Sequence, residues 1–136
     1  MGQDKITIGD KFLHEFQYTQ DEVQLFAKAT GDFNPIHLDD EYAKETIFKK
    51  PIIHGFLGGS IFSKIFGTLW PGEGTIYLKQ SMTFVKPMHV ETKYCAHLEV
   101  KETIEEERKA LIQTEIRHSN KLVIKGEALI IHPHKI

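Results

Sequence analysis

The spacing of hydrophobic residues along the chain changes at about residue 75. Before this point apolar side chains recur every three or four residues, which is the spacing of a helix with one buried face. After it they alternate with polar side chains, which is typical of strands that bury one face. The pattern therefore predicts helices in the first half and an antiparallel sheet in the second.

Two helices are predicted in the first fifty residues. Thr19 followed by Glu22 forms the sequence of a capping box, apolar residues recur at helical spacing after it, and Gly31 supplies a C-terminal stop. A second, short helix is expected within residues 37–48, which carry acidic residues at their start. Because Pro35 disfavours helical backbone at the residue before it, residues 32–37 are predicted to form a loop.

A long apolar helix is predicted after Gly55. Its apolar residues fall on nearly all sides, which is typical of a helix buried in a core, and Pro71-Gly72 ends it. Gly58 and Gly59 lie near its start, where each costs about 1 kcal/mol relative to alanine. Either close packing or access to a ligand would explain them.

Four strands are predicted to follow one another in a meander, at residues 75–87, 92–104, 109–119 and 121–132. Ser119-Asn120 is expected to form a tight hairpin turn, and the acidic stretch before Arg108 a solvated one. A sheet of this kind can bury one apolar helix only by wrapping around it, which gives an α+β fold in a single domain, residues 1–136. The sheet edges that remain favour dimerisation.

Composition and charge exclude several classes of protein. The 136 residues include 17 basic and 19 acidic ones without a basic cluster, so nucleic acid is not an expected partner. The single cysteine, Cys95, cannot form an intramolecular disulfide, and no apolar run is long enough to cross a membrane. We therefore expect a cytoplasmic protein. The eight histidines form no metal-binding motif, so no metal site is predicted.

Two short stretches carry residues that could take part in catalysis or binding. Asp32, Asn34 and His37 combine a carboxylate, an amide and an imidazole, which can share acid and base roles around one substrate. The alternative is that Asp32 and Asn34 only cap a helix and shape a turn. In the second stretch His54-Gly55 precedes the apolar helix, whose free N–H groups could bind an oxyanion. Close packing of helix and sheet is the alternative there.

These stretches, in their order and spacing, resemble one family. The segments GDFNPIHLDDEYA, FKKPIIHGFLGGSIFS and PGEGTIYLKQSMTFVKP resemble the MaoC-like (R)-specific enoyl-CoA hydratases. The resemblance implies a hot-dog fold, in which an antiparallel sheet wraps around a long central helix. It also implies reversible addition of water to a trans-2-enoyl-CoA, giving the (R)-3-hydroxyacyl-CoA, without a metal or organic cofactor.

The resemblance also implies which residues form the site. Asp32 and His37 would be the catalytic pair, and the Gly55 N–H would bind the thioester oxygen. Ser63 would hold Asp32 by a hydrogen bond. Asn34 would brace the loop or orient the water.

The substrate and partners are predicted less directly. Phe62, Phe66 and Trp70 are candidates for closing an acyl pocket, so short to medium chains are expected. An acyl-CoA is favoured over an acyl carrier protein because no basic cluster lies near the site. A homodimer, or a higher oligomer, is expected. The alternatives are an acyl-CoA thioesterase, a 3-hydroxyacyl-ACP dehydratase and a non-catalytic acyl-binding module, since one fold can host them all.

Overall fold

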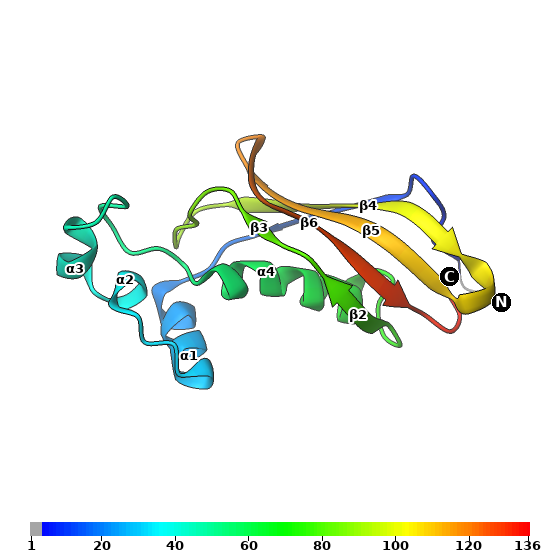
Figure 1. The fold of residues 1–136 in the computed structure, drawn as a ribbon, viewed down its shortest axis with the longest axis horizontal. Helices are drawn as coiled ribbons and strands as arrows, with labels where there is room; N and C mark the ends of the chain where they lie inside the picture. Colours follow the sequence, from blue (N-terminus) through cyan, green and yellow to red (C-terminus); the bar gives the residue numbers. More distant parts are fainter. Residues whose placement is uncertain (1–3) are drawn as a thin grey trace.

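The sheet curls along one side of a central helix, α4 (Gly55–Lys64), in the computed structural model, which describes residues 4–136 (Figure 1). Its described strands are antiparallel and follow the order β1-β4-β5-β6-β2, with β3 beside β6. This arrangement confirms the predicted α+β fold. The strands are β1 (Lys11–Phe16), β2 (Ile76–Gln80), β3 (Thr83–Phe84), β4 (Tyr94–Ile104), β5 (Lys109–His118) and β6 (Lys121–Ile131).

The predicted meander is wrong for its first strand. Residues 75–87 form two strands, β2 and β3, that both pair with β6 rather than with β4, and β1 lies beside β4 instead. Between β2 and β3, the Ser81 N–H donates to the Glu127 carbonyl and the Ser81 hydroxyl accepts from the Glu127 N–H. The alternation of apolar residues determines which face a strand buries, but it does not determine the neighbouring strand.

The turns between the last three strands agree with the prediction. Ser119 and Asn120 both have positive φ, of 49° and 63°, as a two-residue hairpin turn requires. The acidic turn before β5 is a short 3₁₀ helix, η2 (Glu105–Glu107), which ends at Arg108 in the left-handed region. Both segments therefore make the tight connections of an antiparallel sheet.

Helix α1 (Gln20–Thr30) begins and ends where the sequence predicts. The Thr19 side chain accepts from the Glu22 N–H, and the Glu22 side chain accepts from the Thr19 N–H, which completes the capping box. Gly31 ends the helix with a φ of 81°, and its N–H donates to the Ala27 carbonyl. The catalytic candidates follow directly after this stop.

The predicted loop at residues 32–37 is shorter than expected. Its second part belongs to a one-turn helix, α2 (Pro35–Leu38), whose first position is the proline itself. Proline disfavours helix at the residue before it but suits the first helical position, and the Asn34 side chain accepts from the Ile36 N–H as the N-cap. A second short helix, α3 (Asp40–Lys44), follows as predicted.

Helix α4 and its continuation η1 (Ile65–Leu69), a π-helical turn, lie against the inner face of the sheet. A Cβ atom on Gly58 would lie 2.6 Å from Met88 Sδ, and one on Gly59 would overlap Met82 Sδ. Close packing of α4 against the connections on the two sides of β3 therefore explains both glycines, and access to a ligand is not needed to explain them.

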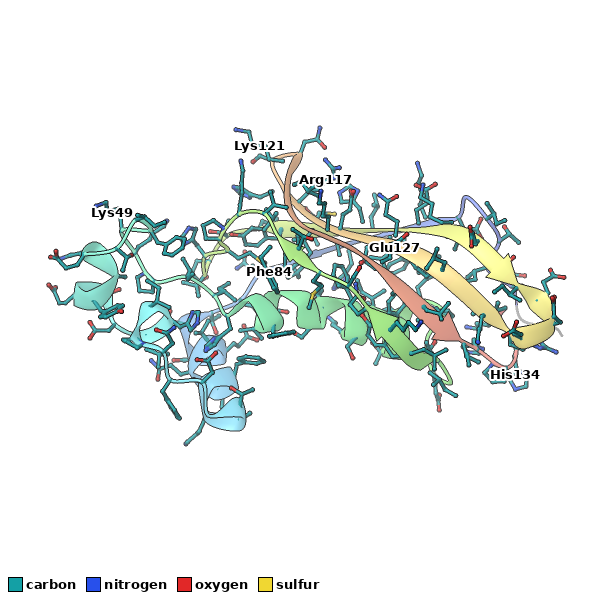
Figure 2. All side chains as sticks on the ribbon, viewed as in Figure 1. Lys49, Phe84, Arg117, Lys121, Glu127 and His134 are labelled. Carbon is teal, nitrogen blue, oxygen red and sulfur yellow. The ribbon has the colours of Figure 1, made fainter. Side chains whose placement is uncertain are left out.

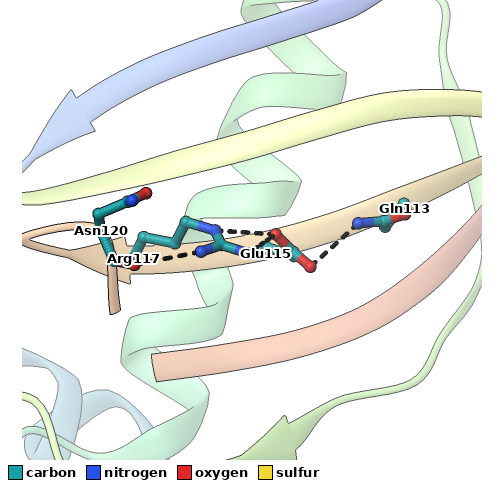
Figure 3. A network of polar contacts seen from close by, with 4 residues as sticks. All are labelled: Gln113, Glu115, Arg117 and Asn120. Atoms are coloured by element: carbon teal, nitrogen blue, oxygen red, sulfur yellow. Dashed lines mark hydrogen bonds and ion pairs between the residues drawn. The ribbon is translucent and has the colours of Figure 1, made fainter. Parts of the chain in front are cut away.

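The outer face of the sheet is polar where its inner face is apolar. Along β5 the Gln113 side chain donates to Glu115, and the Arg117 guanidinium donates to Glu115 and to the Asn120 carbonyl (Figure 3). In the part of the chain that the structure describes, no helix combines the length and apolar character needed to cross a bilayer.

Candidate active site

The two chemically rich stretches of the sequence meet in space. The loop after α1, helix α2 and the first residues of α4 surround a cavity of about 220 Å³. Its lining includes Asp32, His37, His54 and Gly55, with the Phe26 and Phe56 rings beside them. The predicted meeting of the loop with the start of the long helix is therefore confirmed.

Asp32 is exposed at the mouth of this cavity, and the loop backbone fixes its orientation. One carboxylate oxygen accepts from the Asn34 N–H at 3.2 Å, and the Asp32 N–H donates to the Thr30 hydroxyl. The Asn34 side chain caps α2. Asn34 thus braces the loop, and a carboxylate oxygen of Asp32 remains available as a base.

His37 is 8% exposed and lies inside α2, one helical turn after Asn34. Its Nδ1 lies 2.8 Å from the Ile52 carbonyl oxygen, which can only accept, so Nδ1 carries the proton and Nε2 is free to accept one. Burial lowers the pKa of His37 below its ordinary value of 6.5. The Ile52 hydrogen bond opposes this shift, His54 adds to it, and Asp32 opposes it.

The sequence marks His54 only as the residue before Gly55 and predicts no role for it. It is 2% exposed and its ring stacks on His37, with centroids 3.8 Å apart and planes 28° apart. Its Nε2 lies 3.0 Å from the Asp32 carbonyl oxygen. No pattern in the sequence separates this histidine from one that only precedes a helix.

Gly55 is the first residue of α4, so its N–H has no acceptor within the helix. No other acceptor for this N–H lies among residues 4–136. A Cβ atom at Gly55 would lie 2.7 Å from the Phe84 ring, so glycine lets this ring approach the helix start. Figure 2 shows Phe84 between the sheet and the N-terminal part of α4. The free N–H and the positive end of the helix dipole suit a thioester oxygen.

The hydrogen bond from Ser63 to Asp32 that the resemblance implies is not formed within the chain. Ser63 lies eight residues after Gly55 on α4, about 12 Å along the axis at 1.5 Å per residue. It is exposed and lines a separate cavity with Ser60 and Met82. Among the described residues the Asp32 carboxylate accepts from the Asn34 N–H and not from Ser63.

The acyl-pocket candidates lie elsewhere than expected. Phe62 and Phe66 are buried in the core, and Trp70 stacks on Phe12 near the far end of the central helix. None of the three lines the small cavity at Asp32, or the second cavity that His37 and Gly55 also border and that is described below. All-round apolar character identifies a core helix but does not show which side chains border a cavity.

A second cavity, of about 390 Å³, shares His37, Gly55 and Phe56 with the first. Its remaining lining is almost wholly apolar and comes from the connection before α4, from the segment around β3 and from β6: Phe48, Ile52, Ile53, Phe84, Val85, Lys86, Pro87, Met88 and Ile124. This cavity is a better candidate for the acyl-binding site than the space around Phe62, Phe66 and Trp70. A larger cavity, of about 590 Å³, lies against α1 and contains neither Asp32 nor His37.

Asp32, His37 and His54 are also close enough to be considered as metal ligands, since one ligand atom of each lies within 4.8 Å of the others. Two metal-binding imidazoles direct their in-plane lone pairs at one point. Here the two rings are nearly parallel and stacked, so their lone pairs point side by side instead. The geometry is that of a stacked pair, and the prediction of a site without a metal remains a prediction.

Comparison with known proteins gives consistent matches. A family model described as MaoC like domain matches residues 4–122. The (R)-specific enoyl-CoA hydratase of Aeromonas caviae is 37% identical over 134 residues, which cover 98% of this chain and 100% of that protein. The (R)-specific enoyl-CoA hydratase of Rhodospirillum rubrum is 34% identical over 115 residues, covering 85% and 80% of the two chains.

A solved structure, the (R)-hydratase from A. caviae involved in PHA biosynthesis, superposes with a TM-score of 0.90 over 94% of this chain and 98% of that one. The sheet curled around a central helix, together with this superposition, defines a hot-dog fold. The chain belongs to the MaoC-like domain family.

Proposed function

We propose that this protein is an (R)-specific enoyl-CoA hydratase, a hydro-lyase that adds water reversibly to trans-2-enoyl-CoA. One observation carries the proposal: a carboxylate, an imidazole with a free Nε2 and an unpaired helix N–H border the same small cavity. The similarity to hydratases over nearly the whole chain supports the same reaction.

The three groups match the three needs of the reaction. Asp32 takes a proton from the water as its oxygen attacks C3, and His37 Nε2 accepts the second hydrogen bond of the water and orients it. The Gly55 N–H stabilises the negative charge that develops on the thioester oxygen. The proton then returns to C2 through the same pair of groups, so water is consumed and the enzyme is regenerated.

The acyl chain is assigned to the 390 Å³ cavity that begins at His37 and Gly55. This volume is near the lower end of the range of about 300–1000 Å³ for small-molecule pockets, which favours short to medium chains. Met88 and Ile124 replace Phe62, Phe66 and Trp70 as the residues expected to limit chain length. Rates that rise steadily with very long acyl chains would contradict this assignment.

Incubation with crotonyl-CoA tests the function. A hydratase removes the absorbance of the conjugated enoyl group without releasing a thiol, whereas a thioesterase releases free coenzyme A. If the enoyl absorbance persists and no thiol is released, a non-catalytic acyl-binding module is favoured. Comparison with the same acyl group on acyl carrier protein tests the carrier, and the proposal expects the CoA thioester to be used faster.

The proposal includes a cytoplasmic homodimer that works without a metal or organic cofactor. The β2–β3 edge of the sheet carries exposed apolar side chains, Ile76, Leu78, Phe84 and Val85, which a second copy could cover. Sedimentation equilibrium should give twice the chain mass of 15.7 kDa. A monomer at the concentrations of the assay would contradict the dimer and leave the proposed reaction unaffected.

A further inference from the structure

We propose that His54 is a positioning residue: one hydrogen bond and one ring stack from its side chain set where Asp32 and His37 lie relative to the start of α4. The inference rests on the proposed hydratase function. It gives a role to a side chain that need not touch the substrate.

The hydrogen bond connects the catalytic loop to the central helix. His54 is the N-cap residue of α4, and its carbonyl accepts from the Gly58 N–H at 3.0 Å, so its backbone is fixed to the helix. From this position its Nε2–H donates to the Asp32 carbonyl at 3.0 Å. The backbone that carries the proposed base is therefore tied to the helix end that carries the proposed oxyanion donor, Gly55.

The ring stack fixes the second catalytic group. One face of the His54 ring lies on the His37 ring, with centroids 3.8 Å apart. The centroid of the Phe26 ring, on α1, lies 4.8 Å from that of His54. His37 is held in addition by its Nδ1–H bond to the Ile52 carbonyl. Between a stacked neighbour and a fixed hydrogen bond, the His37 ring has one orientation, which directs Nε2 away from the Ile52 bond.

The contacts also define the tautomer of His54. A carbonyl oxygen can only accept, so Nε2 carries the proton, and Nδ1 is buried without a hydrogen-bond partner among the described residues. The Nε2–H of His54 is thus occupied by the Asp32 carbonyl, and proton transfer is left to Asp32 and His37.

A purely structural role is the alternative, in which His54 only fills the space between Phe26 and His37. A space-filling ring needs no donor, so two substitutions separate the roles. His54→Phe keeps an aromatic ring for the stack and removes the donor. His54→Gln places an amide N–H near the former position of Nε2 and removes the ring.

His132 supplies a matched control. It is also 2% exposed, and its Nε2 also lies within hydrogen-bond distance, 2.8 Å, of a backbone carbonyl, that of Glu73. It lies at the other end of the molecule, next to His134 in Figure 2. His132→Phe should therefore lower stability without changing the kinetics.

The experiment measures kcat and KM for crotonyl-CoA hydration across a range of pH for the wild type and the three variants. His54→Phe should lower kcat by about 100-fold with little change in KM, the size expected for small misplacement of reacting groups. His54→Gln should recover at least about tenfold of this loss, and His132→Phe should match the wild type.

The proposal is overturned if His54→Phe keeps the wild-type kcat, or if the Gln and Phe variants lose equal activity and equal stability. A second readout does not depend on activity. Long-range ¹H–¹⁵N NMR of the imidazoles should show the Nε2–H form for His54 and the Nδ1–H form for His37, assigned by their loss in His54→Phe and His37→Ala. An inactive wild type with these tautomers would reject the hydratase function alone, whereas an Nδ1–H form at His54 would reject the positioning role.

Discussion

The cap of α2 should affect catalysis, although the helix has only four residues. The Asn34 side chain accepts from the Ile36 N–H, and α2 carries His37. Removing an N-cap acceptor costs about 1 kcal/mol. At 1.4 kcal/mol for each factor of ten, this corresponds to about fivefold in the population of the formed turn. Asn34→Ala should therefore lower kcat by up to about fivefold, and Asn34→Ser, which keeps an acceptor oxygen, should recover most of it.

The chain contains a matched control for this prediction. Asp39 caps the neighbouring helix α3 in the same way, with its side chain accepting from the Tyr42 N–H at 3.1 Å, but α3 carries no proposed catalytic residue. Asp39→Ala should cost a similar free energy of unfolding and leave kcat unchanged. Crotonyl-CoA hydration measures kcat, and hydrogen exchange followed by mass spectrometry measures local opening. Exchange should accelerate around His37 in Asn34→Ala and around Ala43 in Asp39→Ala.

Two results would refute this reasoning. Equal losses of kcat in Asn34→Ala and Asp39→Ala would mean that general destabilisation, and not the placement of His37, limits the rate. A loss of more than about 100-fold in Asn34→Ala would exceed the value of a cap and would place the Asn34 amide in contact with the reacting water.

Three further predictions follow from the pKa of His37 and from the packing of α4. Because burial lowers the pKa of His37 below 6.5, its neutral form persists below that pH, so the acid limb of kcat/KM should lie below 6.5; a limb above it would contradict the assignment. The same shift means that the unfolded chain binds this proton more readily, so the contribution of His37 to stability is complete above pH 6.5 and is lost as the pH falls through the lowered pKa. In urea unfolding Gly58→Ala should be less stable than Gly67→Ala by about 1–3 kcal/mol, because the Cβ at Gly58 would displace the Met88 side chain, whereas the Cβ at Gly67 would meet no atom of another segment within 4 Å. Equal effects of the two substitutions would reject the packing explanation.

Local signals in the sequence predicted the helices and turns well. The capping box of Thr19 and Glu22, the stop at Gly31 and the turn at Ser119-Asn120 each depend on a few neighbouring residues, and each forms as expected. The error at α2 has a local cause too, because a proline can both exclude helix before it and begin one.

The contacts between distant segments could not be predicted in the same way. Residue spacing does not show that β2 pairs with β6, or that Met88 rather than Phe62 borders a cavity. For the same reason the role of His54 emerged only from the fold, which brings its ring onto His37 and its Nε2 to a carbonyl in another segment. Asp32 and His37, which share one short motif, line one cavity with Gly55, whereas Ser63 lines another. Their roles in the reaction remain predictions.

The central claim is that Asp32 acts as the base on a water held in the cavity beside His37 and Gly55. The most direct test is the rate of crotonyl-CoA hydration by the wild type and by Asp32→Asn, with the chirality of the product determined. The wild type should give (R)-3-hydroxybutyryl-CoA, and Asp32→Asn should be slower by about a thousandfold with an unchanged circular dichroism spectrum. A variant that keeps more than about a tenth of the rate, or a wild type that gives the (S) product, would contradict the claim.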